Sequence, residues 1–172
     1  MSEYLSSILA VVTMNTEFLS PHRTLTLHRW PLSQPNASLQ AWDAADELLL
    51  HHALPLAEQF SQQHQRKPHL LIIHDAFGAL SCGMGDYPHT QINDSLLTQQ
   101  ATVHNRSINQ LDPALLQQLP STAAFPASPD IVLLKLPSNH SYLRYILRQL
   151  AAVVHSGTQV MAAAKAKDIN KN

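Results

Sequence analysis

Two aspartates occupy positions at which a nucleotide-like cofactor could be held. Asp75 follows the apolar run 69–73 and begins the turn 75–81, and the first strand-to-helix turn of an open α/β sheet commonly contacts a phosphate or cofactor. Asp94 lies 19 residues further on, where a carboxylate can accept hydrogen bonds from ribose hydroxyls. The alternative is that Asp94 caps the helix predicted to begin at Ser95, and we favour that interpretation.

The turn after Asp75 lacks the glycines that a cofactor loop needs. In class I methyltransferases an acidic residue is followed by glycines at alternate positions, so that the backbone can pass close to S-adenosylmethionine. Phe77, Ala79 and Ser81 stand at the three glycine positions. The Phe77 ring would enter the volume of the cofactor, and side chains at these positions restrict the turn. We therefore predict that this domain binds no cofactor, with Asp75 and Asp94 as remnants of a degenerate site.

The segment after the predicted strand 131–136, the fourth of the main sheet, also lacks catalytic features. An amino-methylating enzyme would place Asn or Asp, two prolines and an aromatic ring there, to hold the target amine and stack on the base. This chain has Lys135-Leu136-Pro137-Ser138, without the acceptor or the ring. No catalytic residue is predicted. Lys135 is a candidate RNA-phosphate contact, with a position at the wet rim of the sheet as the favoured alternative.

The histidines and the cysteine do not indicate a metal site. The chain has eleven histidines, but they are scattered, and the adjacent pair His51-His52 diverges around a helix. His74, at a strand end, is interpreted as a hydrogen-bonded core or rim residue. Cys82 is the single cysteine, which excludes an internal disulfide and a cysteine-rich zinc site and indicates a reducing compartment. We predict no metal.

Charge is divided unevenly along the chain. The net charge is -1, but residues 1–130 hold five Lys and Arg against eleven Asp and Glu, whereas residues 131–172 hold six against one. Arginines beside an exposed aromatic ring can bind phosphate and stack on unpaired bases. Besides Lys135, the candidate RNA contacts are therefore Arg144, Tyr145, Arg148, Lys165 and Lys167. The simpler alternative is a solvated helix face.

The elements that must position these residues alternate between strands and helices. Strand-length runs are predicted at 25–29, 69–75, 90–93, 115–119, 131–136 and 158–163, and helical patterns at 39–49, 54–64, 95–108 and 141–154. This alternation predicts an α/β, Rossmann-like, doubly wound and mostly parallel sheet of the class I methyltransferase type. Because such sheets usually carry a further strand, we expect it to be truncated.

At 172 residues, the chain has room for one domain of ordinary size. We assign 24–172 to that domain and 1–23 to an N-terminal extension, for which disorder is one expectation. The apolar stretch 5–12 is too short to span a bilayer and lacks the features of a signal peptide, so a cytoplasmic protein without membrane contact is predicted. Met14 is a candidate native start, which would make 1–13 an addition.

Seven stretches together resemble one known family, the amino-terminal domain of the bacterial large-subunit ribosomal RNA guanine-N2 methyltransferase RlmG, a relative of RsmC. The most specific are Asp-Ala-Phe-Gly-Ala-Leu-Ser-Cys at 75–82 and Ala-Lys-Ala-Lys-Asp-Ile at 164–169. The matches run in family order over almost the whole chain after residue 24: 25–29, 39–47, 75–82, 94–95, 121–123, 132–137 and 163–169.

The resemblance implies a protein of two methyltransferase-like domains, of which the carboxyl-terminal copy binds S-adenosylmethionine and catalyses transfer. The present chain then corresponds to a non-catalytic domain that supports the catalytic domain, absent from this chain, and helps to hold ribosomal RNA. Its expected partners are that domain and the RNA. Two alternatives stay open: an active methyltransferase that binds its own cofactor, and a purely structural domain without RNA contact.

Overall fold

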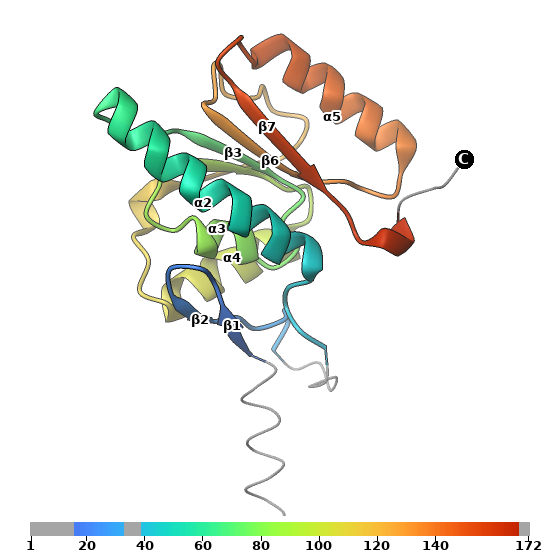
Figure 1. Cartoon of the computed structure of the whole chain (residues 1–172). Helices are drawn as coiled ribbons and strands as arrows, with labels where there is room; N and C mark the ends of the chain where they lie inside the picture. The colour runs from blue at the N-terminus through green and yellow to red at the C-terminus, as the bar shows by residue number, and fades with distance from the viewer. Residues whose placement is uncertain (1–15, 33–38, 169–172) are drawn as a thin grey trace, which may run out of the picture.

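The computed structural model describes residues 16–32 and 39–168, and its centre is a parallel five-stranded sheet (Figure 1). The strands are β3 (Leu70–Ile73), β4 (His89–Ile92), β5 (Leu116–Leu119), β6 (Ile131–Lys135) and β7 (Gln159–Ala163). Their order is β5-β4-β3-β6-β7, and every neighbouring pair is parallel. The predicted doubly wound α/β fold is confirmed. The order of the strands reverses between β3 and β6, which is where open sheets of this kind bind ligands.

Helices cover both faces of the sheet because its central strands are apolar on both sides. α2 (Ala44–His64), α3 (Ala79–Gly83) and α4 (Leu96–Ile108) lie on one face, and α5 (His140–Val153) lies on the other. Alternate residues of β3 face opposite ways: Leu70 and Ile72 belong to the core under α2 and α3, and Leu71 and Ile73 to the core under α5. Two short 3₁₀ helices, η1 (Pro113–Leu115) and η2 (Ala166–Asp168), complete the described elements.

α2 is one continuous helix, whereas the sequence predicted two. It begins later than expected because Asp43 caps it: the Asp43 carboxylate accepts from the Ala45 and Asp46 amides, and Asp46 accepts from the Asp43 amide. Pro55 lies inside the helix without ending it. Buried Ala and Leu side chains before and after Pro55 pack on the sheet, and this packing offsets the missing hydrogen bond.

The described fold includes residues before position 24. β1 (Glu17–Leu19) and β2 (Thr24–Thr26) form an antiparallel hairpin, and Phe18 is fully buried with its ring centroid 5.0 Å from that of Trp42. The predicted boundary at residue 24 is therefore too late, because Phe18 fills part of the core beside α2. Residues 1–13, whose native status was questioned, lie outside the described residues. Among the described helices, none combines the length and apolarity needed to cross a bilayer.

Candidate functional site

The carboxylate of Asp75 lies at the carboxyl end of β3 and is completely buried. Its Oδ2 atom accepts from the Ser81 amide at 2.9 Å and from the Gln91 side-chain amide at 3.2 Å. Burial raises the pKa of Asp75, although the hydrogen bond from the Ser81 amide opposes this. The side chain thus ties the start of α3 to β4 and does not face a ligand site.

The three side chains at the former glycine positions are packed into the protein. Ala79 and Ser81 are buried within α3, and the Ser81 hydroxyl lies 2.6 Å from Nε2 of His89. The Phe77 ring lies under the Arg29 guanidinium, whose carbon is 4.8 Å from the ring centroid. Gly78 keeps a left-handed φ of 85°, and a Cβ there would lie 2.8 Å from Cα of Thr102. This turn therefore packs against α4 and not around a cofactor.

Lys135, at the end of β6, is held by two carboxylates from the start of α2. Its Nζ atom lies 3.0 Å from Oδ2 of Asp43 and 2.9 Å from Oδ2 of Asp46, and its side chain is only 12% exposed. The structure thus places Lys135 neither at a wet rim nor free to contact a phosphate. We call Asp43, Asp46, Asp75 and Lys135 the aspartate–lysine cluster.

Electrostatics within the aspartate–lysine cluster follow from burial. Burial raises the pKa of Asp46 to about 7, and Lys135 opposes this shift while Asp75 adds to it. Burial alone would lower the pKa of Lys135, but Asp46 and Asp43 raise it above its ordinary value. The ammonium of Lys135 therefore stays charged and offsets the negative charge of the neighbouring carboxylates.

Asp94 has a different role from either of those considered. Its carboxylate accepts from the Ser121 amide at 2.6 Å and from the Ser121 hydroxyl at 2.7 Å, which joins the ends of β4 and β5. Burial would raise the pKa of Asp94, but the hydrogen bonds from Ser121 hold it below its ordinary value. The N-cap of α4 is Ser95, without a side-chain cap, so the prediction that Asp94 caps this helix is wrong.

Taken together, the residues at the carboxyl ends of β3, β4 and β6 do not fit S-adenosylmethionine. A class I site needs a flexible glycine loop and free carboxylates. Here the loop positions carry packed side chains, and Asp75 and Asp94 bond to the protein itself. We derive no chemical step through this cofactor.

The predicted basic face of α5 is present and is more apolar than expected. Arg144 and Arg148 are exposed, one helical turn apart. Leu147, between these arginines in the sequence, is 48% exposed. The buried residues of α5 are Ile146 and Leu150. The exposed face therefore combines two cations with one aliphatic side chain.

The other candidate RNA contacts differ in their availability. Tyr145 is not the exposed stacking ring that was expected: its hydroxyl donates to the Ser121 carbonyl at 2.6 Å, and its ring packs on the core under α5. Lys165 is partly exposed, with its Nζ atom 3.5 Å from Oδ2 of Asp43. Lys167 is exposed in η2. The available cations are thus Arg144, Arg148 and Lys167, with Lys165 partly engaged.

Histidine and cysteine side chains have structural contacts here. Within residues 16–32 and 39–168, no three His, Cys, Asp or Glu side chains are arranged to hold a metal ion. His74 is exposed at the end of β3, with Nδ1 3.2 Å from the Lys135 carbonyl oxygen. Burial lowers the pKa of His89 to about 4, so this histidine is neutral, with Nδ1 donating to the Tyr87 carbonyl. Cys82 is buried, and burial raises the pKa of its thiol.

Asp43 and Asp46 are the residues that sequence reasoning missed. Both lie within the helical pattern predicted at 39–49, and neither was predicted to be a site residue. An acidic residue followed three positions later by another is a capping-box pattern, and this pattern could have located the start of α2. Their partner Lys135 lies 89 residues beyond Asp46, and only the tertiary structure brings them together.

The fold, together with the side chains at the carboxyl ends of β3, β4 and β6, defines a methyltransferase-like Rossmann domain. We call this end of the sheet the cofactor edge, and the protein's own side chains fill it. The chain superposes on a proposed S-adenosylmethionine-dependent methyltransferase from Streptococcus mutans with a TM-score of 0.50, 14% identity and coverage of 67% of this chain and 35% of that one. At this identity the likeness concerns the fold alone.

The family follows from the sequence matches. The model of the RLMG N-terminal domain matches residues 15–172, and the chain belongs to that family. The chain is 41% identical over 152 residues to the ribosomal RNA large subunit methyltransferase G of Pseudoalteromonas translucida, and 44% identical over 151 residues to that of Erwinia tasmaniensis. Each match covers 87% of this chain and 38% of the relative, so the chain spans well under half the length of these relatives.

Proposed function

We propose that this chain is a non-catalytic domain that supports the catalytic part of a ribosomal RNA guanine-N2 methyltransferase and helps to hold the ribosomal RNA. The observation that carries the proposal is the contrast between a filled cofactor edge and an exposed basic surface. Lys135 and its aspartates occupy the edge at which a cofactor would be bound. The relatives are ribosomal RNA methyltransferases more than twice as long, which supports a catalytic part beyond the matched region.

The cations available for RNA lie towards one edge of the sheet. α5 begins after the carboxyl end of β6, and η2 follows the carboxyl end of β7. Because these strands are parallel neighbours, both carboxyl ends lie at the same edge. We call the exposed residues Arg144, Arg148, Lys165 and Lys167 the basic surface. The rest of the chain is net negative, so phosphate contacts are expected there and not elsewhere.

The test is charge reversal on α5. The Arg144→Glu, Arg148→Glu double variant should bind protein-free large-subunit ribosomal RNA more weakly than the unmodified chain. Each lost phosphate contact removes roughly 0.7 to 0.9 from the log-log slope of affinity against salt, so the slope should become shallower by roughly 1.4 to 1.8. Filter binding at several salt concentrations measures both quantities.

A control variant removes one positive charge from a different part of the surface. Arg66 is paired with Asp130, with Nη1 2.8 Å from Oδ2, and lies at the amino-end side of the sheet. Arg66→Gln should leave the salt slope unchanged. If charge reversal on α5 alters neither affinity nor slope, the RNA contact is absent and the purely structural interpretation is the better one. We also propose that the protein acts in the cytoplasm, where ribosomal RNA is modified in bacteria.

A further inference from the structure

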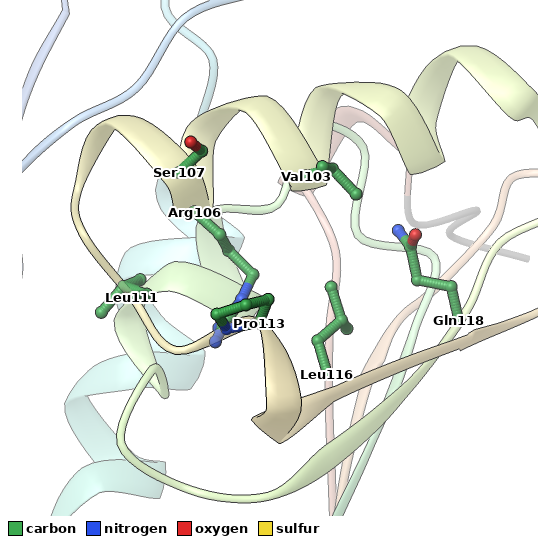
Figure 2. A pocket seen from close by; sticks show the side chains of 7 residues that line it. All are labelled: Val103, Arg106, Ser107, Leu111, Pro113, Leu116 and Gln118. Atoms are coloured by element: carbon green, nitrogen blue, oxygen red, sulfur yellow. The ribbon is translucent and has the colours of Figure 1, made fainter.

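A groove lies between α4, β5 and the segment that follows β2. Its volume is about 510 Å³, and its walls include Trp30, Gln99, Gln100, His104 and Gln118. A second cavity of about 400 Å³ adjoins it, and the two share Val103, Ser107 and Gln118. Figure 2 shows this second cavity, with Val103 on α4 and Leu116 and Gln118 on β5 among the residues that line it. We call the two together the α4–β5 groove.

Aromatic rings form one wall of the α4–β5 groove. The Trp30 and His104 ring centroids are 5.1 Å apart, with the planes at 40°. Asn105 fixes the segment that carries Trp30, because its side-chain amide accepts from the His28 amide and donates to the His28 carbonyl, each at 2.9 Å. Burial, and then His28, lower the pKa of His104. His104 therefore presents a neutral ring beside the indole.

Side-chain amides of Gln99, Gln100 and Gln118 also line the groove, and a hydrogen bond holds each in place. Gln99 donates through Nε2 to the Asn93 carbonyl at 2.8 Å, and Gln118 donates through Nε2 to Gln91 Oε1 at 3.0 Å. Gln100 accepts at Oε1 from the Trp30 indole at 3.4 Å. Among the described residues, Oε1 of Gln99, Oε1 of Gln118 and Nε2 of Gln100 have no other partner and are available to a ligand. Fixed acceptors and a donor beside a flat ring are what the edge and face of a nucleobase require.

The charge of the groove is compatible with a polyanion. None of the residues that line either cavity is Asp or Glu, and α4 contains no acidic residue. Leu96 and Val103 on the groove are 66% and 53% exposed, which gives a base further apolar contact. A phosphate backbone passing this groove would meet no carboxylate on its walls.

We propose that the α4–β5 groove binds an unpaired nucleobase of the RNA, stacked on Trp30 and His104 and hydrogen-bonded to the glutamine amides. This proposal rests on the proposed function, because it identifies a base contact for the same RNA. It adds a site beside β5, at the opposite edge of the sheet from β7, and this site is distinct from the basic surface. Base stacking occurs here, whereas the basic surface supplies phosphate contacts.

The test uses Trp30 fluorescence in a Trp42→Phe background of the full chain, which leaves one tryptophan. A single-stranded RNA octamer should quench Trp30, because a stacked base contacts its ring. An octamer of the same length with abasic sugars keeps the phosphates and should not quench. Replacing His104 by Ala should weaken octamer binding about tenfold, as expected for losing one stacking partner.

A matched pair of variants on β5 guards against misfolding. Gln118→Leu removes an amide from the groove, whereas Gln117→Leu alters the neighbouring residue, which is exposed and points to the other face of the sheet. Only Gln118→Leu should weaken octamer binding, with both melting curves intact. Equal effects of the two variants, or unchanged affinity in both, would overturn the proposal.

The two proposals fail in distinguishable ways. Charge reversal at Arg144 and Arg148 should change the salt slope and leave the Trp30 quenching amplitude at saturation unchanged, whereas His104→Ala should lower affinity without changing the slope. If the octamer does not quench Trp30 but the remaining portion of a full-length relative, added in trans, does, then the groove is a protein interface and the nucleobase proposal is wrong. The basic-surface proposal would stand in that case.

Discussion

The aspartate–lysine cluster and the basic surface use the same type of cation in opposite ways. Lys135 is 12% exposed and contacts two carboxylates, whereas Lys167 is exposed in η2. The first cation holds α2 against the end of β6, and the second remains available to a partner. The comparison shows that Lys135 is unavailable for a phosphate contact because carboxylates from another element hold it, which its position at a strand end did not reveal.

The largest expected effect is the loss of the buried cation. Lys135→Met leaves the buried carboxylate of Asp46 without its charge partner, and breaking a buried ion pair in this way costs about 3 to 5 kcal/mol of unfolding free energy. Urea denaturation measures the change. The matched control on the basic surface, Lys167→Met, should stay within about 0.5 kcal/mol because its side chain is exposed. Similar costs for both variants would remove the distinction between the two regions.

The next effect concerns the apolar support beside the cluster. Trp42 is 8% exposed, and its ring packs on that of Phe18. In the sequence it directly precedes Asp43, the residue that caps α2. Trp42→Ala should cost about 3 kcal/mol, the lower part of the range for deleting a buried ring. A loss below about 1 kcal/mol in denaturant melts would show that the hairpin and the start of α2 contribute little to the core.

A pH dependence should distinguish the cluster from exposed carboxylates. Folding raises the pKa of Asp46 from 3.8 to about 7, so the folded protein binds a proton at Asp46 more tightly than the unfolded chain does. The contribution of Asp46 to stability is therefore complete below pH 3.8 and is lost as pH rises toward about 7. His89, whose pKa is lowered, acts in the opposite direction over part of this window.

The Asp46→Asn variant isolates the Asp46 contribution. Subtracting its unfolding free energy from that of the unmodified chain removes the other titrating groups, and this difference should fall between pH 4 and about 7. Denaturant melts at several pH values measure it. A difference that stays level over this window would mean that Asp46 is charged throughout and that the pair with Lys135 outweighs burial.

The smallest expected effect is on the basic surface itself. Arg144→Glu with Arg148→Glu should change the unfolding free energy by no more than about 0.5 kcal/mol per site, because both side chains are exposed on α5. Thermal melting checks this. A larger loss would mean that the arginines support the fold, and their effect on RNA binding would then not report a direct contact.

The parallel sheet was predictable because its strands are short apolar runs separated by helical patterns. Within the run 69–73, the strand Leu70–Ile73 is buried on both faces, as its composition indicated. The β1–β2 hairpin was only partly predicted, because the one buried side chain of each three-residue strand gives no extended alternation. The five-residue α3 was missed because it is shorter than the window that reveals a helical period.

The degenerate loop was also predictable, since the absence of glycine at Phe77, Ala79 and Ser81 is a local property. The partners of the candidate residues were not. Lys135 and Tyr145 were assigned from their neighbours in sequence, but their actual partners, Asp46 and the Ser121 carbonyl, lie 89 and 24 residues away. Long-range hydrogen bonds of this kind decide which polar side chains remain free, and periodicity does not encode them.

The central claim is that the cofactor edge of this domain is filled by the protein's own side chains. Isothermal titration of the full chain with S-adenosylmethionine tests it most directly, with Arg144→Glu, Arg148→Glu protein as a control for effects remote from the edge. We expect no saturable heat, because the loop positions are packed and Lys135 is held by Asp43 and Asp46. Saturable binding with a dissociation constant of about 1 to 100 μM, in the range of ordinary small-ligand affinities, would contradict the account and favour an active methyltransferase.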